Sequence, residues 1–168
     1  MKIAVIGTSE FTLNCAQILI DNECIVSALV SLPKNNLPNN SANVKEFSLL
    51  NNIPYFETSD INLNISIDYL EELKVDFILS TWPHIIFNRV IGIPKYGVIG
   101  THPTQLPKAK GRHPLHWMIV LGISNSSMSF FKMDETIDGG NILIQEPFIL
   151  GDNINSSNNN MIEAAKNG

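Results

Sequence analysis

The chain has 168 residues, the length of one domain that can bury a core. Its hydrophobic fraction of 44% and charged fraction of 16% are typical of globular proteins, and its formal net charge of −5 weighs against binding to nucleic acid. No apolar run approaches the roughly 20 residues of a membrane span, and residues 1–11 lack a signal-peptide core. We therefore expect a cytoplasmic protein that binds neither nucleic acid nor membranes.

Apolar runs alternate with helical patterns along the first hundred residues. Strands are predicted for residues 2–6, 25–32, 54–57, 76–80 and 97–101, and helices for residues 11–20, 45–50 and 67–73. Residues 35–42, rich in Asn, Pro and Ser, form a loop. The alternation predicts an α/β fold, an open, mostly parallel, twisted sheet with helices on both faces.

Three strand ends carry polar residues that a ligand would meet. They are Gly7-Thr8-Ser9, Ser80-Thr81-Trp82 and Gly100-Thr101-His102, and open parallel sheets bind ligands at the carboxyl ends of their strands. After the first strand there is no GxGxxG, so a dinucleotide fingerprint is absent. Thr8 and Ser9 either offer hydroxyl and N–H groups to a phosphate or form an ordinary polar turn, and the second is the commoner case.

The histidines differ in their settings. His113 and His116 are three residues apart, a spacing compatible with metal ligands, but no cysteine lies near them and we expect no metal. His84 lies in a short polar-apolar loop, where a surface histidine is the ordinary interpretation. His102 directly follows an apolar strand and precedes Pro103, so its imidazole is expected at the edge of the sheet, suited to proton transfer or to donation to an oxyanion.

Residues 133–140 (MDETIDGG) form an acidic turn that ends in two glycines. Its three carboxylates, on Asp134, Glu135 and Asp138, are close enough in sequence to raise one another's pKa or to face a cation or polar ligand. The alternative is an ordinary solvated acidic turn. Asp138 lies 36 positions after His102 (138 − 102), and we expect the two loops to build one active site.

Taken together, these segments resemble the folate-dependent formyltransferase family. The resemblance covers roughly residues 2–150 and is sharpest over residues 97–144. The family's Asn-x-His step, Leu-Pro step and glycine correspond to Gly100-Thr101-His102, Leu106-Pro107 and Gly111, and its aspartate-glycine element corresponds to Asp138-Gly139-Gly140. The resemblance implies a Rossmann-like catalytic domain over residues 1–150. Residues 151–168 form a polar segment in which a helix is predicted to start at residue 161. Because this helix would stop abruptly, the chain is expected to be a truncated piece of a longer one.

The resemblance implies that His102 and Asp138 are catalytic and that the formyl donor is 10-formyltetrahydrofolate, with no metal. The family's catalytic asparagine falls on Gly100, which has no side chain. Loss of one oxyanion donor costs about 10²–10³ in rate. Either Thr101, His113, a backbone N–H or a water replaces the amide, or the activity is weak or lost.

The resemblance also implies the other contacts of the site. The pterin pocket would be lined by Trp82, His84, Ile85, Ile86, Met133, Asp134, Glu135 and Thr136. Thr8, Ser9, Lys108, Arg112 and His113 would meet the acceptor substrate, with Lys108, Lys110 and Arg112 near a diphosphate. The basic loop has an equally ordinary interpretation as a solvated surface.

The acceptor is expected to be the amine of a nucleotide-linked amino sugar. Trp82, the Gly111-Arg112-His113-Pro114 step and the Phe130-Phe131 pair bring the chain closest to the sugar N-formyltransferases. Two alternatives stay open: formylation of glycinamide ribonucleotide, and a catalytically impaired folate- or sugar-nucleotide-binding domain. The resemblance further suggests a homodimer, and Cys15 and Cys24 are expected to be reduced.

Overall fold

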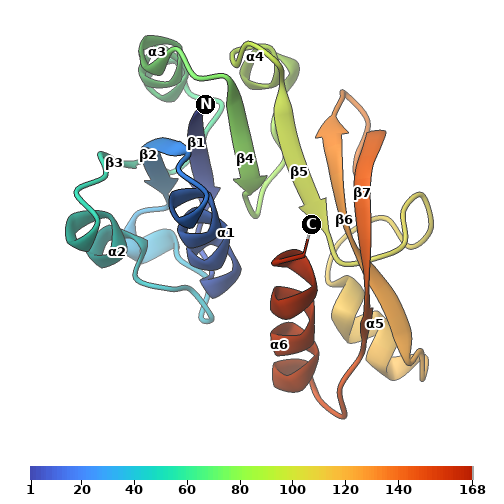
Figure 1. Cartoon of the computed structure of the whole chain (residues 1–168). Helices are drawn as coiled ribbons and strands as arrows, with labels where there is room; N and C mark the ends of the chain where they lie inside the picture. The colour runs from blue at the N-terminus through green and yellow to red at the C-terminus, as the bar shows by residue number, and fades with distance from the viewer. Residues whose placement is uncertain (168) are drawn as a thin grey trace. The chain divides into compact units, whose positions relative to one another are not determined.

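The structure, a computed structural model, describes residues 1–167 in two compact units, Met1–Ile99 and a second that begins at Gly100 (Figure 1). The first unit contains a sheet with the strand order β3-β2-β1-β4-β5. Its strands are β1 (Lys2–Gly7), β2 (Ile25–Ser31), β3 (Tyr55–Glu57), β4 (Phe77–Thr81) and the beginning of β5 (Val98–His102). The pairs β1–β2, β1–β4 and β2–β3 are parallel. The predicted open, mostly parallel sheet is confirmed.

Helices connect these parallel strands. They are α1 (Glu10–Asp21), α2 (Val44–Leu50), α3 (Asn64–Leu73) and α4 (Asn88–Ile91), with a 3₁₀ turn at Lys34–Asn36. The chain moves outward from β1 through β2 to β3 and then returns to β4 on the other side of β1. Because such crossovers are right-handed, α1 and α2 cover one face of the sheet and α3 covers the other.

The buried strands explain why the secondary structure of the first unit could be predicted from the sequence. Ala4, Val5 and Ile6 of β1 have no exposed surface, and a strand covered on both faces is written as a continuous apolar run. The predicted strands and helices of residues 1–102 lie within a few residues of the observed ones, the largest difference being α3, which begins at Asn64 instead of Ile67.

The second unit continues from β5 to the antiparallel hairpin of β6 (Asn125–Met133) and β7 (Gly140–Ile149), with helices α5 (Pro114–Val120) and α6 (Ile154–Ala165). Neither strand of the hairpin was predicted, although its turn was. Serines interrupt the apolar pattern of β6, and β7 contains Pro147, which is tolerated because β7 is an edge strand.

The prediction that a helix starts only at residue 161 is wrong, because α6 begins at Ile154 and includes the polar tract of residues 156–160. Asn153 caps this helix, its Oδ1 accepting from the backbone N–H groups of Asn155 and Ser156, each at 3.0 Å. Ser157, Met161, Ala164 and Ala165 are buried and lie on one face of the helix, and this face packs on β7 and β6. Every helix in the described chain is too short or too polar to cross a lipid bilayer.

Candidate active site

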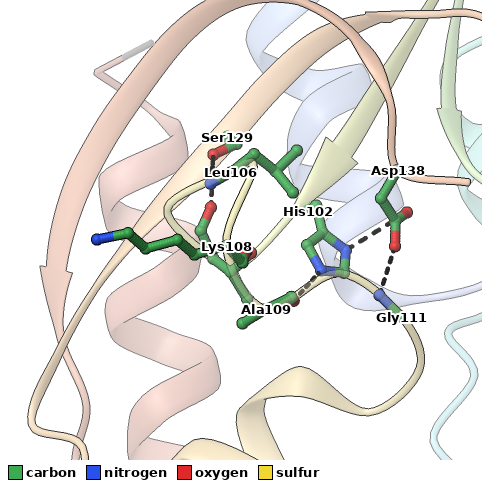
Figure 2. A network of polar contacts seen from close by, with 8 residues as sticks. His102, Leu106, Lys108, Ala109, Gly111, Ser129 and Asp138 are labelled. Carbon is green, nitrogen blue, oxygen red and sulfur yellow. Dashed lines mark hydrogen bonds and ion pairs between the residues drawn. The ribbon is translucent and has the colours of Figure 1, made fainter.

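His102 and Asp138 lie side by side in the second unit (Figure 2). His102 is the last residue of β5, and Asp138 belongs to the turn between β6 and β7. Asp138 Oδ1 is 3.7 Å from His102 Nδ1, a distance for an ion pair with a protonated imidazole but too long for a hydrogen bond. The side chain of His102 is 7% exposed and that of Asp138 is 22% exposed. The expected convergence of the two loops is therefore observed. Of the two side chains, the carboxylate is the more accessible to solvent.

A backbone carbonyl fixes the hydrogen on the imidazole. His102 Nε2 lies 3.1 Å from the carbonyl oxygen of Ala109. A carbonyl oxygen only accepts, so the geometry assigns a hydrogen to Nε2. Both ring nitrogens of His102 thus face an oxygen atom, Nε2 that of Ala109 and Nδ1 that of Asp138. A ligand oxygen can accept a hydrogen bond from the imidazole only if it displaces one of these two oxygens.

Asp138 is held from the opposite side of its carboxylate. The backbone N–H of Gly111 donates to Asp138 Oδ2 at 2.7 Å (Figure 2). Asp138 itself has a positive φ of 46°, a conformation that Asp tolerates better than most residues. Gly140 has φ of 105°, and a Cβ there would lie 1.9 Å from the carbonyl oxygen of Lys132, so the glycine lets the turn close.

Gly100 lies on the same face of β5 as His102, because the two are separated by one residue. A Cβ at position 100 would lie 2.7 Å from Phe131 Cζ and 2.8 Å from Met133 Cγ. The place of an asparagine side chain is therefore filled by β6. Thr101 lies on the opposite face of β5, so its hydroxyl does not take over that place.

Hydrogen bonds organise the acidic turn, and they correct one expectation from the sequence. The Asp134 carboxylate accepts from the hydroxyl and the backbone N–H of Thr136, at 2.5 and 2.8 Å. These two bonds, with a smaller contribution from the charge of Lys110, hold the pKa of Asp134 below its usual range. The expected mutual raising of carboxyl pKa values is therefore wrong for Asp134.

The loop between His102 and α5 carries the predicted acceptor contacts. Lys108, Lys110, Arg112 and His113 are exposed. His113 has φ of 56° at the N-cap of α5, and its ring meets that of His116 edge to face, with 5.7 Å between centroids. Within residues 1–167, no group of three or more His, Cys, Asp or Glu side chains is placed to hold a metal ion.

The first unit contains the other strand ends. Gly7 of β1 pairs in register with Thr81 of β4, so the first two predicted strand ends share one edge. Thr8 is buried, and the backbone N–H of Ser9 donates to Thr12 Oγ1 at 3.1 Å as part of the cap of α1. That N–H is already bonded, which favours the polar-turn alternative over a phosphate site.

Trp82, His84 and Ile86 follow β4. Trp82 is 8% exposed and its indole Nε1–H has no hydrogen-bond partner among the described residues. The His84 ring lies edge-on to it, with 6.5 Å between centroids, and Ile86 is buried. These residues lie in the first unit and Met133–Thr136 lie in the second. The pterin pocket stays a prediction.

Asn62, which precedes α3, contacts this segment and was not indicated by the sequence. Its side-chain amide donates to the carbonyl of Ile85 at 3.0 Å, and its Oδ1 accepts from the N–H of Phe87 at 2.8 Å. One amide thus fixes both ends of the Ile85–Phe87 step, leaving the Ile85 side chain 60% exposed. A single Asn in a polar stretch carries no periodic or motif signal, so only coordinates reveal it.

Comparison with known families decides how this site is classified. The model of the formyl transferase family matches residues 1–166. The chain belongs to this family. The resemblance of residues 97–144 to folate-dependent formyltransferases is thereby confirmed.

The curated relatives include methionyl-tRNA formyltransferases. Those of Mycoplasma pneumoniae and Fusobacterium nucleatum are 33% and 30% identical to the chain, over 93% and 90% of its length. The chain spans about half of these relatives, 51% and 50% respectively.

Solved structures show the same fold at lower identity. Phosphoribosylglycinamide formyltransferase from Bacillus halodurans has a TM-score of 0.79 and 19% identity, covering 99% of this chain and 89% of that one. A sugar 3N-formyl transferase solved in the presence of dTDP and 5-N-formyl-THF has a TM-score of 0.69 and 22% identity, covering 99% of this chain and 59% of that one. At these identities the likeness establishes the Rossmann-like fold of the family.

Proposed function

We propose that the chain transfers the formyl group of 10-formyltetrahydrofolate to a primary amine, and that this amine belongs to a nucleotide-linked amino sugar. The observation that carries formyl transfer is the His102–Asp138 pair, held by Ala109 and Gly111 in a member of the formyl transferase family. An imidazole N–H and a partly exposed carboxylate supply the donor and the proton acceptor that this reaction needs.

The reaction forms a bond between the amine nitrogen and the formyl carbon and breaks the bond from that carbon to N10 of the folate. The amine loses one proton and N10 gains one. His102 donates its Nε2–H to the formyl oxygen as negative charge develops there, and this oxygen replaces the Ala109 carbonyl as acceptor. Asp138 accepts the proton from the amine, directly or through water, and its charge orients the imidazole.

Two features support folate as the donor. The indole N–H of Trp82 is buried without a partner among the described residues, so a ligand acceptor would satisfy it. Ile85, three residues after Trp82, is 60% exposed and offers an apolar surface to a flat ring.

The basic loop supports a phosphorylated acceptor. Lys108, Lys110 and Arg112 are all exposed and flank Ala109 and Gly111, the residues whose backbone contacts the catalytic pair. Cations on this loop would bind a diphosphate while the attached sugar amine reaches His102. The net charge of −5 makes a small phosphorylated molecule a better match than a long nucleic acid.

Methionyl-tRNA is the second candidate acceptor. Curated relatives at 30–33% identity carry the name methionyl-tRNA formyltransferase. The same His102–Asp138 chemistry would formylate the methionyl amine, so the acceptor, and not the mechanism, separates the two candidates.

A panel of acceptors tests the proposal. Purified protein is incubated with 10-formyltetrahydrofolate and, separately, with dTDP-linked 3-amino and 4-amino sugars, glycinamide ribonucleotide and methionyl-tRNA, and products are detected by mass spectrometry. We expect the highest kcat/KM with an amino sugar. Formylation of methionyl-tRNA or glycinamide ribonucleotide alone would replace the proposed acceptor. Folate binding by calorimetry without any formylated product would contradict transfer and support the impaired binding domain.

A further inference from the structure

A polar pair on the β6–β7 hairpin, the buried Ser129 and the half-buried Gln145, contacts the loop of residues 103–111 beside His102 and Asp138. Ser129 and Gln145 are direct cross-strand partners, so their side chains leave the same face of the hairpin. Ser129 has no exposed surface. Figure 2 shows the Ser129 hydroxyl beside Leu106 of this loop.

Four hydrogen bonds join this pair to the loop and to itself. The Ser129 hydroxyl donates to the Thr104 carbonyl at 2.5 Å and lies 3.4 Å from the N–H of Leu106. The Gln145 amide donates to Ser129 Oγ at 2.8 Å and to the Leu106 carbonyl at 3.0 Å. The loop backbone at residues 104 and 106 is therefore held by side chains of the hairpin, those of Ser129 and Gln145.

We call Ser129 and Gln145 the clamp. A short series of contacts connects the clamp to His102 and Asp138. The hydroxyl of Thr104, which is also buried, donates to the Lys108 carbonyl at 2.9 Å. The next residue, Ala109, accepts from His102, and Gly111 donates to Asp138. A shift of the loop at Thr104 would thus move both groups that hold the imidazole and the carboxylate.

We propose that Ser129 and Gln145 are positioning residues, which act through the loop of residues 103–111 to set the geometry of His102 and Asp138. This inference rests on the proposed formyl transfer for its kinetic consequence but not for its structural one. Buried hydrogen bonds that are fully satisfied specify one conformation of a loop, and misplacing a catalytic group by about 1 Å can cost about 10²-fold in rate.

The kinetic test uses Ser129→Ala and Gln145→Met in the full chain, with Ser127→Ala as the matched control. Ser127 lies on β6 two residues from Ser129, and no hydrogen bond joins it to the loop among those found in residues 1–167. We expect kcat to fall by about 10- to 10²-fold in both clamp variants while the folate dissociation constant changes less than about threefold. The control should keep the kcat of the wild type.

Epistasis separates positioning from a general loss of stability. In a background that carries both His102→Asn and Asp138→Asn, the imidazole and the carboxylate that the loop positions are both absent, so adding Ser129→Ala should leave the residual rate unchanged. A further fall as large as in the wild-type background would overturn the inference.

A second readout does not require activity. In ¹⁵N spectra of the imidazoles, Ser129→Ala and Gln145→Met should each shift the His102 signals while those of His113 and His116 stay in place. If the wild type forms no formylated product, the proposed function fails. The ¹⁵N spectra then become the test of whether Ser129 and Gln145 position His102. Unchanged His102 signals in both clamp variants would overturn it.

Discussion

Gly100 is the position at which the chain departs from the motif that it otherwise matches. The structure shows that the missing amide does not leave a gap, because Phe131 and Met133 of β6 occupy the space that a Cβ would enter. The space beside Gly100 is therefore filled by side chains of β6. Restoring the asparagine alone would not restore an open place for it.

Substitution of Gly100 tests this packing. We expect Gly100→Ala to lower the free energy of unfolding by about 1–3 kcal/mol, because its Cβ overpacks against Phe131. Urea unfolding followed by circular dichroism measures the change.

A double variant provides the control for that prediction. Phe131→Leu removes the ring atoms nearest to the new Cβ, so Gly100→Ala should cost less in the Phe131→Leu background than in the wild type. An unchanged unfolding midpoint for Gly100→Ala in the wild-type background would show that the site is looser than described.

Residue-level prediction from the sequence reached the groups with distinctive chemistry. His102 after an apolar run and Asp138 before two glycines could be identified, and their convergence is observed. The contacts that orient them could not, because Ala109 and Gly111 act through backbone atoms, which every residue has. Loop backbone geometry has no periodic signal in a single sequence.

Elements covered on both faces were easier to predict than those with mixed environments. The strands of the first unit are continuous apolar runs, whereas β6 alternates serine with apolar residues and was missed. The polar tract of residues 156–160 looked unsuited to a helix. Its helix is explained by the Asn153 cap and by a buried stripe of small residues and Met161, which depends on packing against β7.

The cap of α6 gives a test at this scale. We expect Asn153→Ala to lower the free energy of unfolding by about 1 kcal/mol, since two N–H groups lose their acceptor. Asn155→Ala is the matched control, because Asn155 is exposed within the helix and should leave stability unchanged or slightly raised. Thermal unfolding of both variants measures the difference, and equal melting temperatures would contradict the capping role.

For the whole chain, the two units differ in how well their sequences specify them. Residues 1–99 repeat one strand-helix pattern, and this alternation predicts a parallel sheet with right-handed crossovers. The unit that begins at Gly100 combines a loop, a hairpin and two helices, and it contains His102 and Asp138. The family match over residues 1–166 covers both.

Thiol reactivity reports on folding of the chain as a whole. Burial raises the pKa of Cys15 from 9.0 to about 12, so at pH 8 it stays a protonated, covered thiol while Cys24 is partly exposed. We expect a disulfide reagent to label one thiol in the native protein and two in denaturant. Rapid labelling of both native thiols would contradict the described core.

The same shift predicts a pH dependence with a definite sign. The folded state holds the Cys15 proton more tightly than the unfolded state, so this contribution to stability is complete below pH 9.0 and is lost as the pH rises toward about 12. A Cys15→Ser variant, followed by urea unfolding from pH 8 to pH 11, should show a shallower loss than the wild type. An identical slope would contradict the burial of this thiol.

Single-turnover transfer by His102→Asn and Asp138→Asn, measured together with folate affinity, tests the central claim most directly. With the acceptor that the wild type uses, each variant should transfer the formyl group about 10²- to 10⁴-fold more slowly, while the folate dissociation constant and the unfolding midpoint stay close to those of the wild type. Transfer at near wild-type rates by either variant would contradict the catalytic roles assigned to this pair.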